Sequence, residues 1–150
     1  MGASSAVDVN VQQLIARPVK DVFAAVVEPR EMSQYFISRG SGPIKAGQRI
    51  EWEFADVGRS FSIDVKEADP NHRIVFTWPA SGPLTKVTMR FQAQHEETLV
   101  AIHEESWAMD DEGVRRALGQ TRGWTDFLCC LKAYLEHGIN LRRGRKRQDH

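Results

Sequence analysis

The stretch DDEGVRRALGQTRGWTDFLCCLKAYLEHG, residues 110–138, has the spacing of one long amphipathic helix. Asp110 or Asp111 is suited to cap its start, and Gly138 is suited to end it. Between these ends, apolar side chains and one threonine recur every three or four residues for about six turns: Val114, Ala117, Leu118, Thr121, Trp124, Leu128, Leu131 and Leu135. We therefore expect a C-terminal helix that packs one face against the rest of the chain.

Two glycines leave part of this helix bare. Gly119 and Gly123 lie about one turn apart, so one stripe of the helix surface carries almost no side chain. Each glycine costs about 1 kcal/mol relative to alanine in a helix. One explanation is close packing against a bulky strand residue such as Trp52 or Trp78. The other is that the bare stripe leaves space for a ligand.

The middle of the chain alternates between apolar and polar residues. Ile50, Trp52 and Phe54, for example, alternate with charged neighbours, which is typical of a strand with one buried face. The same pattern predicts strands over residues 49–54, 61–66, 74–78, 87–92 and about 98–107. Short turns such as Asp-Pro-Asn at 69–71 separate them. We therefore expect an antiparallel meander with one face in the core.

The N-terminal part adds a first strand at about 8–16 and two short helices. Pro18 suits the start of one helix and Pro29 ends it and opens the next, while the Gly-Ser-Gly-Pro run at 40–43 is expected to be a loop. Residues 1–7 are expected to be disordered, 8–138 to form one domain, and 139–150 to form a basic tail. The tail is interpreted as a solvated C-terminus, with binding of an anionic surface as the alternative.

Composition excludes several classes of function. The chain has 20 Lys plus Arg and 20 Asp plus Glu, so no global field favours nucleic acid, and we expect no nucleic-acid partner. No signal peptide and no run of about 20 apolar residues is visible, which predicts a cytoplasmic protein without a membrane span. The five histidines lack metal-ligand spacing, and no phosphate-binding loop or nucleophile elbow is apparent. We therefore expect no metal and no cofactor.

Three stretches together resemble a known family. They are ARPVKDVF at 16–23, DPNHRIVFTW at 69–78 and GWTDFL at 123–128. With their order along the chain, they resemble the START-like superfamily, also named SRPBCC, and within it the activator of Hsp90 ATPase homologue 1-like family.

The resemblance implies a helix-grip fold of the α+β class. In this fold a curved antiparallel sheet wraps around a long C-terminal helix, two short helices follow the first strand, and a cavity is enclosed. Relatives in the superfamily bind lipids, sterols, polyketides or plant hormones, and a few are cyclases or hydroxylating subunits. The eukaryotic co-chaperones of the family carry an additional N-terminal domain, which we do not expect within these 150 residues.

Glu104 is the anomaly of the last strand. Because Val100 and Ile102 face the core, the alternation sends Glu104 and Ser106 the same way. A carboxylate among apolar side chains is costly unless it is paired, so it is a candidate ligand anchor or acid–base group. Two other interpretations remain open. A bulge could instead bury Leu99, Ala101 and His103, or Glu104 could lie at the rim beside Arg115 or Arg122.

These residues define the expected site and its function. We expect non-enzymatic binding of a small hydrophobic or amphipathic molecule in a cavity between the sheet and the C-terminal helix. The residues expected to line it are Trp52, Phe54, Phe76, Trp78, Met89, Ile102, Glu104, Gly119, Gly123 and Trp124. The alternative interpretation is that the same aromatic side chains belong to an ordinary hydrophobic core.

Two alternative functions stay open. One is an enzyme of the cyclase, isomerase or hydrolase type that uses Glu104 as its acid or base. The other is a protein-interaction or co-chaperone-like module of a stress response, which would use the outer sheet face or the basic tail to bind a protein partner. The protein is expected to be a monomer or a homodimer, the latter formed through outer-face residues such as Val75, Leu99 and Ala101.

Overall fold

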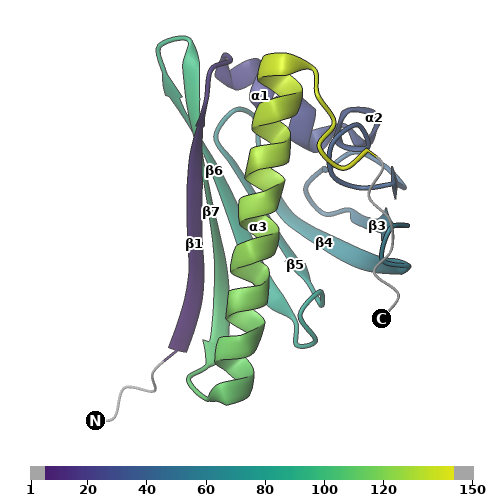
Figure 1. Ribbon diagram of the computed structural model, residues 1–150, viewed down its shortest axis with the longest axis vertical. Coiled ribbons are helices and arrows are strands. Elements are labelled where there is room, and N and C mark those ends of the chain that lie inside the picture. Colours follow the sequence, from purple (N-terminus) through teal and green to yellow (C-terminus); the bar gives the residue numbers. More distant parts are fainter. Residues whose placement is uncertain (1–5, 144–150) are drawn as a thin grey trace.

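The computed structural model describes residues 6–143, which form a curved antiparallel sheet gripping one long helix (Figure 1). Within these residues the sheet has seven strands in the order β1-β7-β6-β5-β4-β3-β2. The helix-grip fold expected from the sequence is confirmed. The elements are β1 (Ala6–Ile15), α1 (Val19–Val27), α2 (Pro29–Met32), β2 (Arg39–Gly40), β3 (Arg49–Phe54), β4 (Arg59–Asp69), β5 (Arg73–Trp78), β6 (Thr85–Gln94), β7 (Glu97–Ala108) and α3 (Asp111–His137).

The meander from β3 to β7 follows the alternation in the sequence. In β3 the side chains of Ile50, Trp52 and Phe54 are buried, while the residues between them are exposed. The predicted turn after β4 is present: Asn71 has a φ of +66°, and the His72 N–H donates to the Asp69 carbonyl over 3.0 Å. The apolar rows of these strands therefore make up the buried face of the sheet.

β1 closes the other side of the sheet by pairing with β7. The ladder runs from Ala6 opposite Ala108 to Ile15 opposite Thr98. The strand therefore begins two residues before the predicted domain start at 8, and Ala6 and Val7 are ordered parts of it. Residues 1–5, also expected to be disordered, lie outside the described residues.

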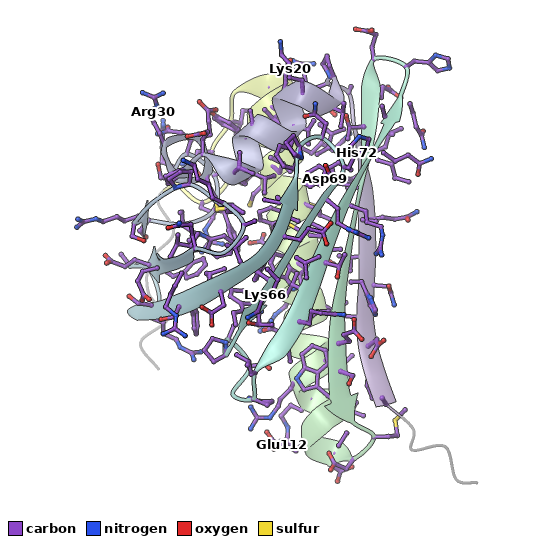
Figure 2. All side chains as sticks on the ribbon, turned by 180° about the vertical axis from the view of Figure 1, so that it is seen from behind. Lys20, Arg30, Lys66, Asp69, His72 and Glu112 are labelled. Carbon is purple, nitrogen blue, oxygen red and sulfur yellow. The ribbon has the colours of Figure 1, made fainter. Side chains whose placement is uncertain are left out.

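Both ends of α3 are held as the sequence predicts. The Asp110 side chain accepts from the Gly113 N–H over 2.7 Å, and Gly138 ends the helix with a φ of +66°. Gly113 packs so closely on the end of β7 that an added Cβ would lie 1.8 Å from the Ala108 carbonyl oxygen. Viewed from behind, the sheet lies in front of α3, with Glu112 at the opposite end of the molecule from Lys20 (Figure 2).

Two segments differ from expectation. Gly40, predicted in a loop, belongs to the short edge strand β2 opposite Trp52; a Cβ there would lie 2.9 Å from Ile37 Cδ1, so only glycine fits without displacement. The start of the basic tail is not a solvated end either. After α3 the chain turns back toward β3 (Figure 1), and Arg142 pairs there with Asp56 and Asp126. The remaining tail residues, 144–150, lie outside the described part of the chain.

No helix in residues 6–143 is long and apolar enough to cross a membrane.

Candidate functional site

Glu104 points into the core, and its side chain is fully buried. The inward orientation predicted from the alternation is correct. The bulge interpretation that would bury Leu99, Ala101 and His103 is wrong, because His103 faces outward and its Nε2 lies 2.8 Å from Asp8 Oδ2. The rim interpretation is also wrong, because Glu104 is 0% exposed and neither Arg115, which pairs with Glu112, nor Arg122 is among its hydrogen-bond donors.

The alternation fails two residues later. Ser106 was expected to face the core, but it is exposed and Trp107 is buried in its place. Between the pairs Val7–Trp107 and Val9–Glu104, β1 has one residue and β7 has two. This bulge in β7 shifts the side-chain phase by one residue.

Four neutral side chains donate hydrogen bonds to the buried carboxylate of Glu104. Its Oε1 accepts from Trp124 Nε1 at 2.7 Å and from Gln120 Nε2 at 3.0 Å. Its Oε2 accepts from Thr85 Oγ1 at 2.5 Å and from Trp78 Nε1 at 3.0 Å. These donors come from β5, β6 and α3, so the carboxylate ties the helix to the sheet. An ionised carboxylate has about four lone-pair sites, and here each of them has a donor.

Gln120 is the one donor of the four that is not buried. Trp78, Thr85 and Trp124 are each at most 5% exposed, whereas Gln120 is half-buried. A molecule that approaches Glu104 from solvent therefore meets Gln120 first. Since the carboxylate is already saturated, that molecule has to displace a donor and replace its hydrogen bond.

Aromatic rings fill the space around this carboxylate. Trp78 packs against Trp124 with ring centroids 5.3 Å apart and against Trp52 at 5.9 Å. Phe76 packs edge-on to Trp52 at 5.5 Å. Half of the ten residues expected to line a cavity are therefore side chains of a packed core behind the site: Trp52, Phe54, Phe76, Met89 and Ile102.

A hollow of about 100 Å³ lies between α3 and the rings of Trp78 and Trp124. Beside it lies a second hollow of about 160 Å³, and Phe36 and Arg142 belong to the walls of both. The Arg142 guanidinium contacts Asp56 at 2.7 Å and Asp126 at 3.1 Å. Together with Phe36, it forms the boundary between the two hollows. The 100 Å³ hollow is lined by Phe36, Trp78, Gln120, Gly123, Trp124, Asp126 and Arg142.

The sequence profile of the activator of Hsp90 ATPase homolog 1-like family matches residues 16–136 of the chain. The chain belongs to this family. No curated protein matches it.

Solved structures agree with the family. A protein of Staphylococcus saprophyticus is 29% identical, with a TM-score of 0.80 over 91% of this chain and 96% of that one. DynU16, a protein from the dynemicin biosynthetic locus, is also 29% identical, with a TM-score of 0.82 over 94% of this chain, which spans 51% of DynU16. The Aha1 dimer of Colwellia psychrerythraea shares the fold at 20% identity and a TM-score of 0.77, over 89% of this chain and 99% of that one.

The two bare glycines of α3, Gly119 and Gly123, do not share one explanation. Both are exposed, and an added Cβ at Gly119 or Gly123 would have no heavy atom within 4 Å. The close-packing explanation against Trp52 or Trp78 is therefore wrong. Gly123 lines the 100 Å³ hollow, whereas Gly119 is not among the residues that line it.

Sequence reasoning missed five residues of the site: Phe36, Thr85, Gln120, Asp126 and Arg142. Gln120 could have been found, since it lies one turn before Trp124 and so shares its helix face. Thr85 lies opposite Trp78 in the pairing of β5 with β6. The alternation of side chains shows which face a residue is on, but not which residue of the next strand is its partner. Arg142 was assigned to the tail.

A larger and shallower hollow of about 810 Å³ lies around the β4–β5 turn, near Asp69 and His72 (Figure 2). Its charged wall includes Arg73, which is already paired with Glu67 at 2.8 Å. We place the candidate site in the smaller hollow because three of the residues that line it, Trp78, Gln120 and Trp124, donate to the buried carboxylate of Glu104. Within residues 6–143 no cluster of three or more His, Cys, Asp or Glu side chains is arranged to hold a metal ion.

Proposed function

We propose that this family member binds a small hydrophobic or amphipathic molecule in the hollow beside Trp78 and Trp124, with a hydrogen-bond donor of the ligand reaching Glu104. The observation that carries the proposal is the buried Glu104 carboxylate, which is separated from an aromatic hollow by the half-buried Gln120. Apolar walls with a few convergent polar groups are the usual composition of a ligand site.

The ligand enters by moving two side chains. At about 100 Å³ the hollow is smaller than the roughly 300–1,000 Å³ of typical ligand pockets. Rotation of Arg142 away from Phe36 joins it to the neighbouring 160 Å³ hollow. Rotation of Gln120 gives access to Glu104, and the ligand donor then restores the lost hydrogen bond. Both residues carry long side chains near the surface, so these motions do not disturb the packed core.

The hydrogen bonds of Glu104 favour binding over catalysis. A general base needs a free lone pair near the proton that it removes. In the described structure the carboxylate oxygens already accept from Trp78, Trp124, Thr85 and Gln120. The anchor role uses the donor network as it stands, with one donor exchanged. The origin of DynU16 in a biosynthetic locus is in keeping with a small-molecule ligand.

A matched pair of glycine variants tests the proposal. A panel of fatty acids, sterols, flavonoids and aromatic metabolites is first screened by thermal shift. A ligand at about 100 times its Kd adds about 2.7 kcal/mol of stability. The best compound is then measured against Gly123→Leu, which fills the hollow, and Gly119→Leu, which adds the same side chain to the same exposed stripe outside it.

We expect Gly123→Leu to abolish the stabilisation and Gly119→Leu to retain it. Equal binding to both variants would place the ligand elsewhere on the protein. A panel without any hit would indicate that the aromatic rings are core alone.

A further inference from the structure

We propose that two copies of this chain associate through β1, edge to edge and antiparallel, so that their two sheets become one continuous sheet. This inference is independent of the ligand site. It rests on an unpaired strand edge that lacks the usual protection against pairing, and on a sequence of outward groups along β1 that is complementary to its own reverse.

One side of β1 has no strand beside it. β1 stands at the end of the sheet order (Figure 1), so its only strand partner among the described residues is β7. Two bonds to α3 show which backbone groups face the free side: the Leu14 carbonyl accepts from Lys132 Nζ at 2.6 Å, and the Ala16 N–H donates to a side chain of the same helix. Backbone groups alternate between the two sides of a strand, so those of Asn10 and Gln12 also face outward.

β1 lacks the features that normally keep a strand edge unpaired. Protected edges are very short, or they carry lysine, proline or a bulge. The opposite edge of this sheet, β2, is only two residues long. β1 is ten residues long and contains neither lysine nor proline. Its one charged side chain, Asp8, lies 2.8 Å from His103 of β7, and the bulge between the two strands has its extra residue in β7. The free edge is therefore long, regular and almost uncharged.

Apolar side chains flank this edge. Leu14 of β1 is 37% exposed. On α3, Val114 lies about five turns before Lys132, and therefore on the helix face that reaches the edge of β1. Val114 and Leu118, about one turn further on, are 36% and 66% exposed. Exposed valine and leucine beside an unpaired edge favour a contact that removes them from water.

The outward residues of β1 pair with their own reverse. A two-fold axis at Val11 places Asn10 of one copy opposite Gln12 of the partner subunit, and the converse pair lies beside it. The same axis places Asp8 opposite Leu14 of the partner subunit. Each outward N–H and C=O then finds a group of opposite kind, in the alternating pattern of an antiparallel ladder.

Charge complementarity favours a second copy over an unrelated strand. The antiparallel pairing brings Asp8, the one acid of β1, to the end of the partner strand where Lys132 supplies a cation. The Leu14 carbonyl at that end has two lone pairs, so it accepts from Lys132 and from the incoming strand together. No like charges meet along the ladder, because Asp8 is the only charged residue of the strand.

Amide hydrogen exchange at two protein concentrations tests the proposal on the full chain. The contact is one strand wide and lies at the lower end of interface sizes, so we expect monomers in dilute solution and dimers at millimolar concentration. The amides of Asn10 and Gln12 should exchange about tenfold more slowly, or slower still, at the higher concentration. The amide of Val11, which faces β7, should stay protected at both. Sedimentation measures the mass under the same conditions.

Two variants locate the contact at β1. Gln12→Pro removes an outward N–H and leaves the ladder with β7 intact, so it should abolish the dimer. Gln12→Lys keeps the backbone unchanged and adds the residue that protects natural edges, so it should weaken the dimer about tenfold. Its matched control is Gln92→Lys, at an exposed position of the central strand β6, which should leave dimerisation unchanged.

Three results would overturn the proposal. The first is a chain that stays monomeric at millimolar concentration. The second is a dimer in which Asn10 and Gln12 exchange as fast as in dilute solution, and the third is a dimer that Gln12→Pro and Gln12→Lys both leave unchanged. In the last two cases the copies would meet elsewhere, for example through the outer face of the sheet. None of these results bears on the ligand site.

Discussion

Trp124 of α3 and Glu104 of β7 join the two layers of the fold through a hydrogen bond of 2.7 Å, from the indole Nε1 to the carboxylate Oε1. Both side chains are buried, at 2% and 0% exposure. Trp78 makes the matching bond from β5 to the other carboxylate oxygen. The same carboxylate is therefore a structural tie and, in our proposal, the anchor of the ligand.

Glu104→Gln should destabilise the protein by about 1–3 kcal/mol, because the amide brings its own N–H donors against the indole and hydroxyl donors that the carboxylate accepts. Urea denaturation at neutral pH measures the loss. The matched control is Glu105→Gln, the next residue of the strand, which makes only outer-face contacts, with Lys86 at 3.4 Å and His103 at 3.8 Å. That control should cost less than about 1 kcal/mol. Equal losses in the two variants would show that the donor network contributes nothing.

Three glycines of α3 should respond to alanine in opposite directions. Gly119→Ala and Gly123→Ala should each stabilise by about 1 kcal/mol, because the new methyl group meets open space and alanine favours the helix. Gly113→Ala should destabilise by about 1–3 kcal/mol or more, because its Cβ would lie 1.8 Å from the Ala108 oxygen. Thermal or chemical denaturation of the three variants tests the set. Stabilisation by Gly113→Ala would mean that the start of α3 does not pack on β7 in this way.

The sequence was sufficient where a local rule determines the structure. Alternation placed Trp52 and Glu104 on the inner face, and the capping rules placed both ends of α3. Each of these predictions needs only the few residues around the position in question. The order of the described strands from β3 to β7 follows as well, because short turns leave neighbouring strands side by side.

The rest depends on contacts between distant segments. β1, the first strand of the chain, pairs with β7, the last, at one edge of the sheet, and hydrophobic pattern alone does not select that partner. The bulge beside Ser106 depends in turn on the register of that pairing. Arg142 reaches Asp56 across 86 positions of the sequence, so a run of basic residues gave no sign that its first member is held in the fold.

Arg142→Met should destabilise the protein by about 1–2 kcal/mol, because it leaves the carboxylates of Asp56 and Asp126 close together without their shared cation. Methionine keeps part of the apolar stem, so the loss reports mainly on the charge. The neighbouring Arg143→Met is the control, and at an exposed position it should change stability by less than about 0.5 kcal/mol. High salt should reduce the difference between the two variants. A difference of zero at low salt would mean that the C-terminal segment is not fastened by these ion pairs.

Glu136 should make the attachment of β1 to α3 sensitive to acid. Its carboxylate accepts from the Ala16 N–H at 2.7 Å and from Lys132 Nζ at 2.7 Å, and these bonds hold the pKa of Glu136 below its ordinary value of 4.5. The unfolded chain therefore binds this proton at a higher pH than the folded protein does. The stabilisation is complete above about pH 4.5 and is lost as the pH falls through the lower pKa of the folded state.

Urea denaturation between pH 3 and pH 7 should show this loss as a gap between the wild type and Glu136→Gln. The gap should be constant near neutrality and should close in acid. Lys132→Met should retain part of the acid sensitivity, because the Ala16 N–H still donates to the carboxylate. Curves for the wild type and Glu136→Gln that stay parallel down to pH 3 would show that Glu136 does not fasten the first strand to the helix.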